Sequence, residues 1–271
     1  MPPGFLLVSA EPGDNVSLDE FQGRPHTSIG SNPSPRYADW YNNEHVPLRL
    51  NHLPSFLTGA RYSAADTATP SWLAVYDIDD TATFEHDSYT RLRANRSPRE
   101  ANLVSRLAIL DRRTYALVAD SGESPLTTSY KPENPTAYLI TQWVSLSGDG
   151  NFAAWSATAF RGLGAVEGWV RTRTYKCIDN LKTGTRVPPG PDAQIVPKYL
   201  AVHGAYATSL SIQLLTRVRN PLPPEVLSLS VADSPAFIAT SNPDSLATLE
   251  ESRTWNLYRA YPCVAQGNLP A

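Results

Sequence analysis

The residues best suited to chemistry lie in one short stretch, residues 39–49. On a helix that advances about 100° per residue, a set of side chains from this stretch shares one arc of roughly 140°: Trp40, Tyr41, Glu44, His45 and Leu48. Its aromatic rings should face the interior, yet it also carries a carboxylate and an imidazole. Burying such groups is costly unless they find partners, so such a helix often borders a pocket. We predict a site here; a core-edge histidine with one hydrogen bond is the alternative.

Each polar residue of this arc has a candidate role. His45 is the candidate acid/base, because the pKa of imidazole lies near neutrality and a carboxylate such as Glu44 could tune it. Adjacent helix positions do not face each other, so a direct pairing of these two is not assured. Tyr41, one turn earlier, could orient a substrate oxygen or serve as a core aromatic, and Trp40 would contact the substrate. Arg49 could anchor a substrate carboxylate or simply stabilise the helix C-terminus.

Three polar side chains outside this stretch are candidates to bind substrate, each with the alternative of a satisfied polar group at the rim of a sheet. Tyr76 alternates with Ala74 and Trp72 on one face of a predicted strand. His86 follows on a predicted helix, and His203 occupies the strand position that corresponds to Tyr76 in the second half of the chain. We find no phosphate-binding glycine loop, no GxSxG and no HExxH, so we expect neither a cofactor nor a metal.

The first half of the chain predicts a β-α-β-β-α-β order, which is that of the ferredoxin-like unit. Apolar runs and alternating patterns predict strands at residues 5–10, 60–63, 71–78 and 113–118. Helices are predicted after the capping-box pattern of Ser17 and Glu20, after residues 79–81, and from 97 to 107.

Residues 23–38 interrupt the first predicted helix with three prolines and two glycines. Without these 16 residues, one apolar face would continue in register from Ser17 to Leu48. We interpret the segment as a looped-out surface insertion or a translated intron, and sequencing the transcript would distinguish the two.

The second half of the chain repeats the strand pattern of the first. The matching segments begin at Phe5 and Tyr138, at Gly59 and Gly168, at Trp72 and Tyr199, and at Arg113 and Arg253. Two half-covered sheets can bury their open faces on each other. We therefore predict an α+β fold of two tandem ferredoxin-like (β-α-β-β-α-β) repeats packed as an intrachain pseudo-dimeric α/β barrel. The predicted division is a first repeat at 1–120, a linker at 121–136, a second repeat at 137–262 and a tail at 263–271.

The stretch Trp40-Tyr-Asn-Asn-Glu-His-Val-Pro-Leu48 resembles the aromatic-x-x-x-His-x-Pro-Leu helix of the dimeric α/β-barrel superfamily. Within that group the chain looks most like the EthD-type and related fungal tandem proteins. The layout resembles the superfamily over nearly the whole chain, whereas the motif covers only about ten residues. The corresponding segment of the second half, around Phe152 and Trp155, keeps an aromatic residue but has no histidine. A histidine-based site is therefore expected once per chain.

The resemblance implies a small-molecule enzyme, because the superfamily includes cofactor-independent polyketide cyclases, decarboxylases, dehydratases and anthrone-type monooxygenases, beside isomerases and haem enzymes. In its plant polyketide cyclase a Tyr and a His act on substrate, which is the role implied for Tyr76 and His86. We expect His45 to move a proton on an aromatic or polyketide-like substrate. The alternatives are a non-catalytic carrier or degenerate paralogue that binds an apolar ligand, and a haem protein.

The composition is that of a soluble globular chain: 271 residues, 41% hydrophobic, 18% charged, net charge −3. Because no Lys/Arg-rich run and no apolar run of about 20 residues occurs, we expect neither nucleic-acid nor membrane partners. Cys177 and Cys263 suggest reduced, buried thiols, with a disulfide as the less favoured alternative. We expect a cytoplasmic monomer with an internal pseudo-dimer; a further homodimer stays open.

Overall fold

The computed structural model describes residues 1–22, 40–146, 152–153, 155–157, 160, 168–206 and 247–263. The predicted insert, residues 23–38, lies outside the described residues, so its interpretation stays a prediction. The segment around Phe152 and Trp155 is described only in part.

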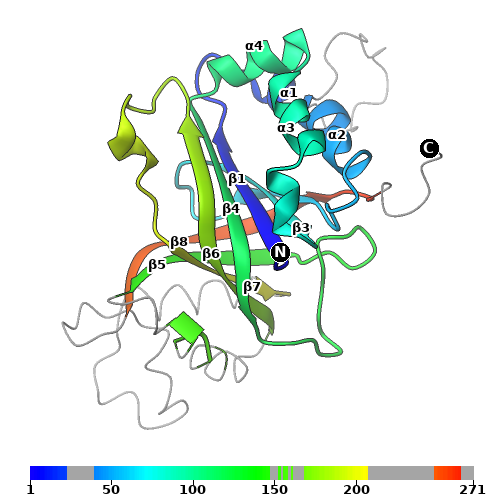
Figure 1. Cartoon of the computed structure of the whole chain (residues 1–271), viewed down its shortest axis with the longest axis vertical. Helices are drawn as coiled ribbons and strands as arrows, with labels where there is room; N and C mark the ends of the chain where they lie inside the picture. The colour runs from blue at the N-terminus through cyan, green and yellow to red at the C-terminus, as the bar shows by residue number, and fades with distance from the viewer. Residues whose placement is uncertain are drawn as a thin grey trace.

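The described residues form eight β-strands (Figure 1), and all eight were predicted: four from apolar runs and alternating patterns, and four because the second half repeats the first. They are β1 (Gly4–Glu11), β2 (Ala60–Ala64), β3 (Trp72–Ile78), β4 (Ile109–Asp120), β5 (Tyr138–Leu146), β6 (Trp169–Thr183), β7 (Tyr199–Ala205) and β8 (Ala247–Ala260). β6 and β8 are the longest, with 15 and 14 residues.

The strands close into one antiparallel barrel in the order β1-β3-β2-β8-β5-β7-β6-β4. β4 also pairs with β1, so the sheet returns to its first strand. Strands from the two halves of the chain hydrogen-bond at two seams, β2 with β8 and β4 with β6. In the second seam, Leu110 lies opposite Thr183 and Asp120 lies opposite Arg173.

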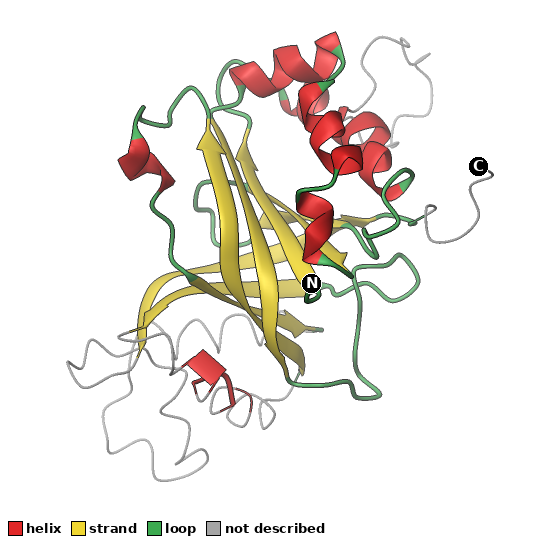
Figure 2. Ribbon diagram, viewed as in Figure 1, coloured by secondary structure: helices red, strands yellow, loops and turns green. Residues whose placement is uncertain are grey.

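The predicted fold class of two tandem ferredoxin-like repeats in a pseudo-dimeric α/β barrel is therefore wrong. The structure is a single closed eight-stranded barrel, and more of its described residues lie in strands than in helices (Figure 2). The repeated apolar runs predicted the strands, but they carried no information on which edges would pair. An unpaired edge leaves N–H and C=O groups without partners, and both seams satisfy those groups across the two halves.

The described helices gather mainly on one side of the barrel, over the strands of the first half (Figure 2). They are α1 (Leu18–Gln22), the π-helical turn η1 (Tyr41–His45), α2 (Val46–Leu50), the 3₁₀ turn η2 (Thr81–Phe84), α3 (Asp87–Ala94) and α4 (Pro98–Arg106). A further 3₁₀ turn, η4 (Pro191–Gln194), follows β6. The predicted start of α1 is confirmed, since the Glu20 N–H donates to Ser17 Oγ at 3.1 Å.

Alternation along the strands separates two apolar cores. Phe5 and Leu7 of β1 point into the barrel, where they join a cluster that includes Tyr62. Leu6 and Val8 point outward and pack beneath the helices. The core between the sheet and the helices, which contains Leu6 and Val8, also contains the predicted site.

The segment predicted as a linker, residues 121–136, contributes to the barrel interior. Tyr130 is buried, with its ring centre 6.0 Å from that of Phe5 and 6.3 Å from that of Tyr62. The Tyr62 hydroxyl donates to the Thr136 carbonyl at 2.9 Å. This segment therefore packs against the core.

A buried ion pair ties the turn between β2 and β3 to β8. Asp66 accepts hydrogen bonds from Arg253 Nε at 2.8 Å and from the backbone N–H groups of Ala68 and Thr254 at 3.0 and 3.1 Å. Arg253 also donates to the carbonyls of Ala68 and Pro70, both at 2.9 Å. Burial alone would raise the pKa of the Asp66 carboxyl, but the hydrogen bonds from Arg253 and the backbone hold that pKa below its ordinary value. The pair stabilises the β2–β8 seam.

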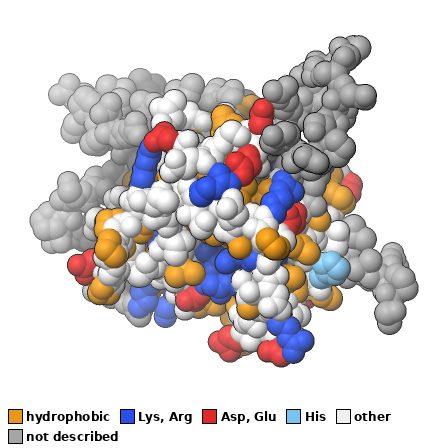
Figure 3. Space-filling view, turned by 90° about the horizontal axis from the view of Figure 1, so that it is seen from above, with side chains coloured by type: hydrophobic (Ala, Val, Ile, Leu, Met, Phe, Trp, Pro, Cys, Tyr) orange, Lys and Arg blue, Asp and Glu red, His pale blue; other side chains and the backbone are white. Residues whose placement is uncertain are grey.

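The surface carries both signs of charge. On the face shown in Figure 3, Lys and Arg side chains are interspersed with Asp and Glu. Among the described residues, no helix is long and apolar enough to cross a membrane. Cys177 and Cys263 are free thiols, half-buried rather than fully buried as expected, and burial raises the pKa of each to about 11.

Candidate functional site

The stretch predicted to carry the site forms a π-helical turn, η1, that runs directly into α2. The Val46 N–H donates to the Tyr41 carbonyl, which is five residues back instead of the four of an α-helix. Pro47, which has no N–H, then opens α2. The regular α-helix predicted for residues 39–49 is therefore wrong at its centre. Such single π-turns are frequent at functional sites, because they re-aim the side chains of one turn.

The π-helical turn brings three rings together beneath the helices. The ring centres of Trp40 and Tyr41 are 5.0 Å apart, and His45 lies 4.7 Å from Trp40 and 4.9 Å from Tyr41. Phe21 of α1 contacts Tyr41 edge-on at 5.4 Å. All four side chains are buried. This packing holds the imidazole in an aromatic, largely water-free surrounding.

His45 pairs with Glu100 of α4. His45 Nδ1 lies 2.7 Å from Glu100 Oε1, and the two residues are 7% and 1% exposed. Burial is the main reason that the pKa of His45 falls to about 4; Arg49 lowers it further, against the opposing effect of Glu100. Burial alone would raise the pKa of Glu100, but the hydrogen bond from His45 and the charges of His45, Arg49 and Arg96 bring it below its ordinary value. Near neutral pH, a neutral imidazole therefore meets an ionised carboxylate.

These protonation states determine the tautomer of His45. An ionised carboxylate can only accept a hydrogen bond, so Nδ1 carries the proton and donates it to Glu100. Nε2 then keeps its lone pair and can accept a proton. The arrangement is that of a general base held in position by a carboxylate.

The two charged candidates on either side of His45, Arg49 and Glu44, differ in their placement. Arg49 lies at the site, where its Nη1 donates to the His45 carbonyl at 2.6 Å and its side chain is buried. Glu44 faces elsewhere: it accepts from Ser97 Oγ and lies 3.5 Å from Arg99 Nη1. The carboxylate that pairs with His45 is therefore not the neighbouring Glu44 suggested by the sequence.

The three predicted residues outside this stretch are dispersed. Tyr76 of β3 belongs to the same core as the aromatic cluster, and its side chain is buried. His86 is exposed and caps α3. His203 of β7 lies in the second half, buried beside Thr172 Oγ1 at 2.9 Å and Gln142 Oε1 at 3.3 Å, and burial lowers its pKa to about 3. Within the described residues, no group of three or more His, Cys, Asp and Glu could hold a metal ion.

Arg61 of β2 is a site residue that sequence reasoning missed. Its guanidinium lies over the Tyr41 ring, 3.9 Å from the ring centre, and the residue is 1% exposed. Arg61 Nη1 donates to Asn42 Oδ1 at 3.0 Å. The Tyr261 hydroxyl donates to the same oxygen.

Glu100 was also missed, although a local signal marks its position. Ser97 and Glu100 have the S-x-x-E spacing of a capping box, and Ser97 Oγ accepts from the Glu100 N–H at 3.0 Å. In a full capping box the carboxylate would turn back to the helix start, whereas here it is directed at His45. No local signal could have linked Arg61 or Tyr261 to residues 39–49, because the pairing of separate strands decides that contact.

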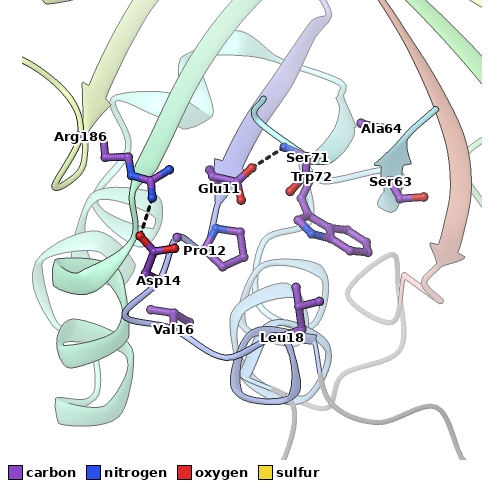
Figure 4. A pocket seen from close by; sticks show the side chains of 11 residues that line it. Glu11, Pro12, Asp14, Val16, Leu18, Ser63, Ala64, Ser71, Trp72 and Arg186 are labelled. Carbon is purple, nitrogen blue, oxygen red and sulfur yellow. Dashed lines mark hydrogen bonds and ion pairs between the residues drawn. The ribbon is translucent and has the colours of Figure 1, made fainter. Parts of the chain in front are cut away.

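A pocket of about 470 Å³ opens beside this cluster, at the ends of β1, β2 and β3 (Figure 4). Its lining includes Ser63 and Trp72, and the Trp72 indole points toward it. The same indole contacts the buried cluster, with its ring centre 6.2 Å from that of Phe21 and 5.3 Å from the Arg61 Cζ. Trp72 therefore stands between the open pocket and the buried site.

The fold and the site together define a class: a closed antiparallel barrel with helices over one face and a buried His–Glu pair between the two layers. No protein-family model matches the sequence, and no curated protein matches it. Solved structures do match in fold. An anthrone oxidase-like protein is similar with a TM-score of 0.50 at 9% sequence identity, over 98% of this chain and 94% of that chain.

Two further solved structures match less closely. A candidate monooxygenase from Lactobacillus acidophilus has a TM-score of 0.41 at 8% identity, over 98% of each chain. A candidate chlorite dismutase has a TM-score of 0.46 at 8% identity, over 96% of each chain. At these identities the likeness is one of fold alone. The superfamily, EthD-type and fungal assignments stay predictions.

Proposed function

We propose that the protein is a cofactor-independent enzyme of monooxygenase type that acts on an aromatic or polyketide-like substrate, with His45 as the base. The observation that carries this proposal is the buried contact of 2.7 Å between His45 Nδ1 and Glu100 Oε1. That contact holds the imidazole in the tautomer whose Nε2 can take a proton. The similarity in fold to an anthrone oxidase-like protein supports the proposed reaction type.

His45 would remove a proton from a carbon or phenol that is acidified by a neighbouring carbonyl. As the proton arrives at Nε2, the Glu100 carboxylate stabilises the imidazolium that forms. Trp40 and Tyr41, whose rings contact the imidazole, would hold a flat substrate in place. The buried surrounding strengthens each of these electrostatic interactions, because it excludes water.

The reaction on an anthrone-type methylene group balances with O2 as the only co-substrate. Deprotonation gives a carbanion, which forms a C–O bond with O2 and yields a peroxide anion. That anion takes the proton back from His45. Loss of water from the hydroperoxide breaks the O–O bond and the remaining C–H bond, and leaves a new carbonyl. Overall, CH2 and O2 become C=O and H2O.

The proposal is tested by incubating the pure protein with anthrone and with 1,8-dihydroxyanthrone in air-saturated buffer, without added cofactor. We expect O2 consumption and anthraquinone formation in a one-to-one ratio, faster than with heat-denatured protein. Rates equal to those of the denatured control for both compounds would contradict the proposed reaction. Tight binding of anthraquinone without turnover would instead favour an apolar-ligand carrier.

Glu100→Gln is expected to lower kcat on the order of 10²-fold with little change in KM, because the imidazolium loses its stabilising charge. The matched control is Glu44→Gln, which removes the neighbouring carboxylate that bonds Ser97 and approaches Arg99. We expect this control to keep kcat within about threefold of wild type, since Glu44 does not contact the imidazole. Equal losses in both variants would contradict the assignment of Glu100 as the residue that positions His45.

A further inference from the structure

Arg61 is a buried cation that has no counter-ion among the described residues. Its side chain is 1% exposed. Among the described residues no carboxylate lies within ion-pair distance of it, whereas the buried Arg113 and Arg253 each pair with an aspartate, Asp111 and Asp66. Burying an unpaired charge costs several kcal/mol even after relaxation, so an uncompensated cation at a site favours an anion there.

Aromatic rings account for only part of the Arg61 environment. The guanidinium carbon lies 3.9 Å from the centre of the Tyr41 ring, and between 5.2 and 5.3 Å from those of Phe21, Trp72 and Tyr258. Ring faces stabilise the flat face of a guanidinium. They offer no acceptor to its in-plane N–H groups, which need oxygen lone pairs.

The hydrogen bonds of Arg61 leave one nitrogen of its guanidinium without an acceptor. Nη1 donates to the neutral amide oxygen of Asn42 at 3.0 Å. Nη2 is buried and has no hydrogen-bond partner. The Trp40 indole N–H of the same core shares this property. Buried donors are almost always paired, so two unpaired donors in one aromatic core indicate a missing acceptor.

The register of the sheet places Arg61 next to the open pocket. β2 pairs with β3 so that Arg61 lies opposite Ala74 and Ser63 lies opposite Trp72. Ser63 shares the outward face of β2 with Arg61 and lines the pocket. Trp72, which lines the same pocket, covers the guanidinium. Trp72 is therefore the side chain that contacts both Arg61 and the pocket.

We propose that Arg61 binds an anionic oxygen, a carboxylate or a phenolate, on a flat aromatic ligand that stacks among Tyr41, Phe21 and Trp72. The proposal rests on the proposed function, because it assigns the substrate class of the same site: an aromatic compound that carries a negative charge. In it Arg61 is the specificity-determining residue, and His45, whose ring centre lies 4.9 Å from that of Tyr41, is the base.

The experiment compares two ligands that differ in charge but hardly in shape, 2-naphthoate and 2-naphthamide, by isothermal titration at neutral pH. We expect wild-type protein to bind 2-naphthoate at least about tenfold more tightly, the ratio given by one charge-assisted hydrogen bond. Arg61→Met, which keeps much of the length of the side chain, should reduce the ratio of the two affinities to about one. The control is Arg259→Met, which removes an exposed arginine opposite Arg61 that also lies over an aromatic ring. This control should keep the wild-type ratio.

Equal affinity of wild-type protein for the two ligands, or no binding of 2-naphthoate, overturns the proposal even if Arg61→Met does not fold. A preference that persists in Arg61→Met, or disappears in Arg259→Met, overturns it as well. The absorption spectrum of bound 2-naphthol identifies the kind of anion: a naphtholate spectrum shows that phenolates are accepted, and a neutral spectrum restricts the site to carboxylates. His45→Asn should keep the preference for 2-naphthoate, so a failed base assignment is distinguished from a failed anion site.

Discussion

Replacing His45 with asparagine is expected to lower kcat/KM for an anthrone on the order of 10³-fold, the usual contribution of a positioned general base. The asparagine amide can still donate to Glu100 from the position of His45 Nδ1, so the pair of residues stays satisfied. The asparagine side chain has no basic nitrogen that could take a proton in place of His45 Nε2. The loss should therefore fall on kcat, and thermal unfolding followed by circular dichroism should change little.

The pH dependence of wild-type activity should report the same group. Because the pKa of His45 is about 4 instead of 6.5, kcat/KM should be constant above about pH 5 and fall only as the pH drops through 4. Between pH 6.5 and about 4 the unfolded chain protonates this histidine and the folded chain does not. His45 therefore reduces the free energy of unfolding as the pH falls through that window. In His45→Asn the free energy of unfolding should depend less steeply on pH between pH 6.5 and about 4.

A matched control for His45 is His86, which is exposed and caps α3. His86→Asn keeps a side chain that caps helices well and should leave kcat/KM within about twofold. Turnover by His45→Asn at the wild-type rate, or an acid limb near pH 6.5 that the variant retains, would contradict the role of His45 as the base.

Asp66→Asn is expected to lower the free energy of unfolding by about 3–5 kcal/mol, the usual cost of leaving one member of a buried ion pair uncompensated. The arginine left behind, Arg253, is 5% exposed as a side chain and would keep two backbone acceptors and the exposed Glu251, whose Oε1 lies 3.7 Å from Nη1. The effect should appear in urea titrations as a lower midpoint with an unchanged slope. Amide exchange should become faster in β2 and β8, whose seam this pair stabilises.

The ion pair also predicts an acid dependence with a definite sign. The pKa of Asp66 is lower in the folded chain than its ordinary value of 3.8, so the pair contributes its full stabilisation above that value. The contribution is lost as the pH falls through the folded pKa. Asp66→Asn should therefore remove part of the acid destabilisation of the protein.

Two further variants test whether the loss of stability in Asp66→Asn comes from the burial of the ion pair. Asp87→Asn breaks the exposed pair of Asp87 and Arg91 and should cost less than about 1 kcal/mol. The double variant Asp66→Asn with Arg253→Met removes both charges and should recover part of the lost stability. A loss of the same size in Asp87→Asn, or no recovery in the double variant, would contradict the burial explanation.

Local patterns predicted most of the secondary structure and part of the site. Ser17 and Glu20 marked the start of α1, and apolar runs, alternation and the repeat marked the eight strands, because capping and alternation depend on near neighbours. The placement of Trp40, Tyr41 and His45 on one buried face followed from their spacing. Glu44 failed as the partner of His45 because the π-helical turn and α4 together direct it to Ser97.

The sequence by itself determined where the strands lie, which stretch carries the imidazole and that aromatic rings surround it. Only the tertiary structure decided that the strands of both halves close into one barrel, that Glu100 pairs with His45, and that Arg61 lies over Tyr41. Periodicity and capping act over a few residues. Edge pairing and burial instead join residues such as His45 and Glu100, which are 55 positions apart, and their energies depend on water that is excluded only once the chain has folded.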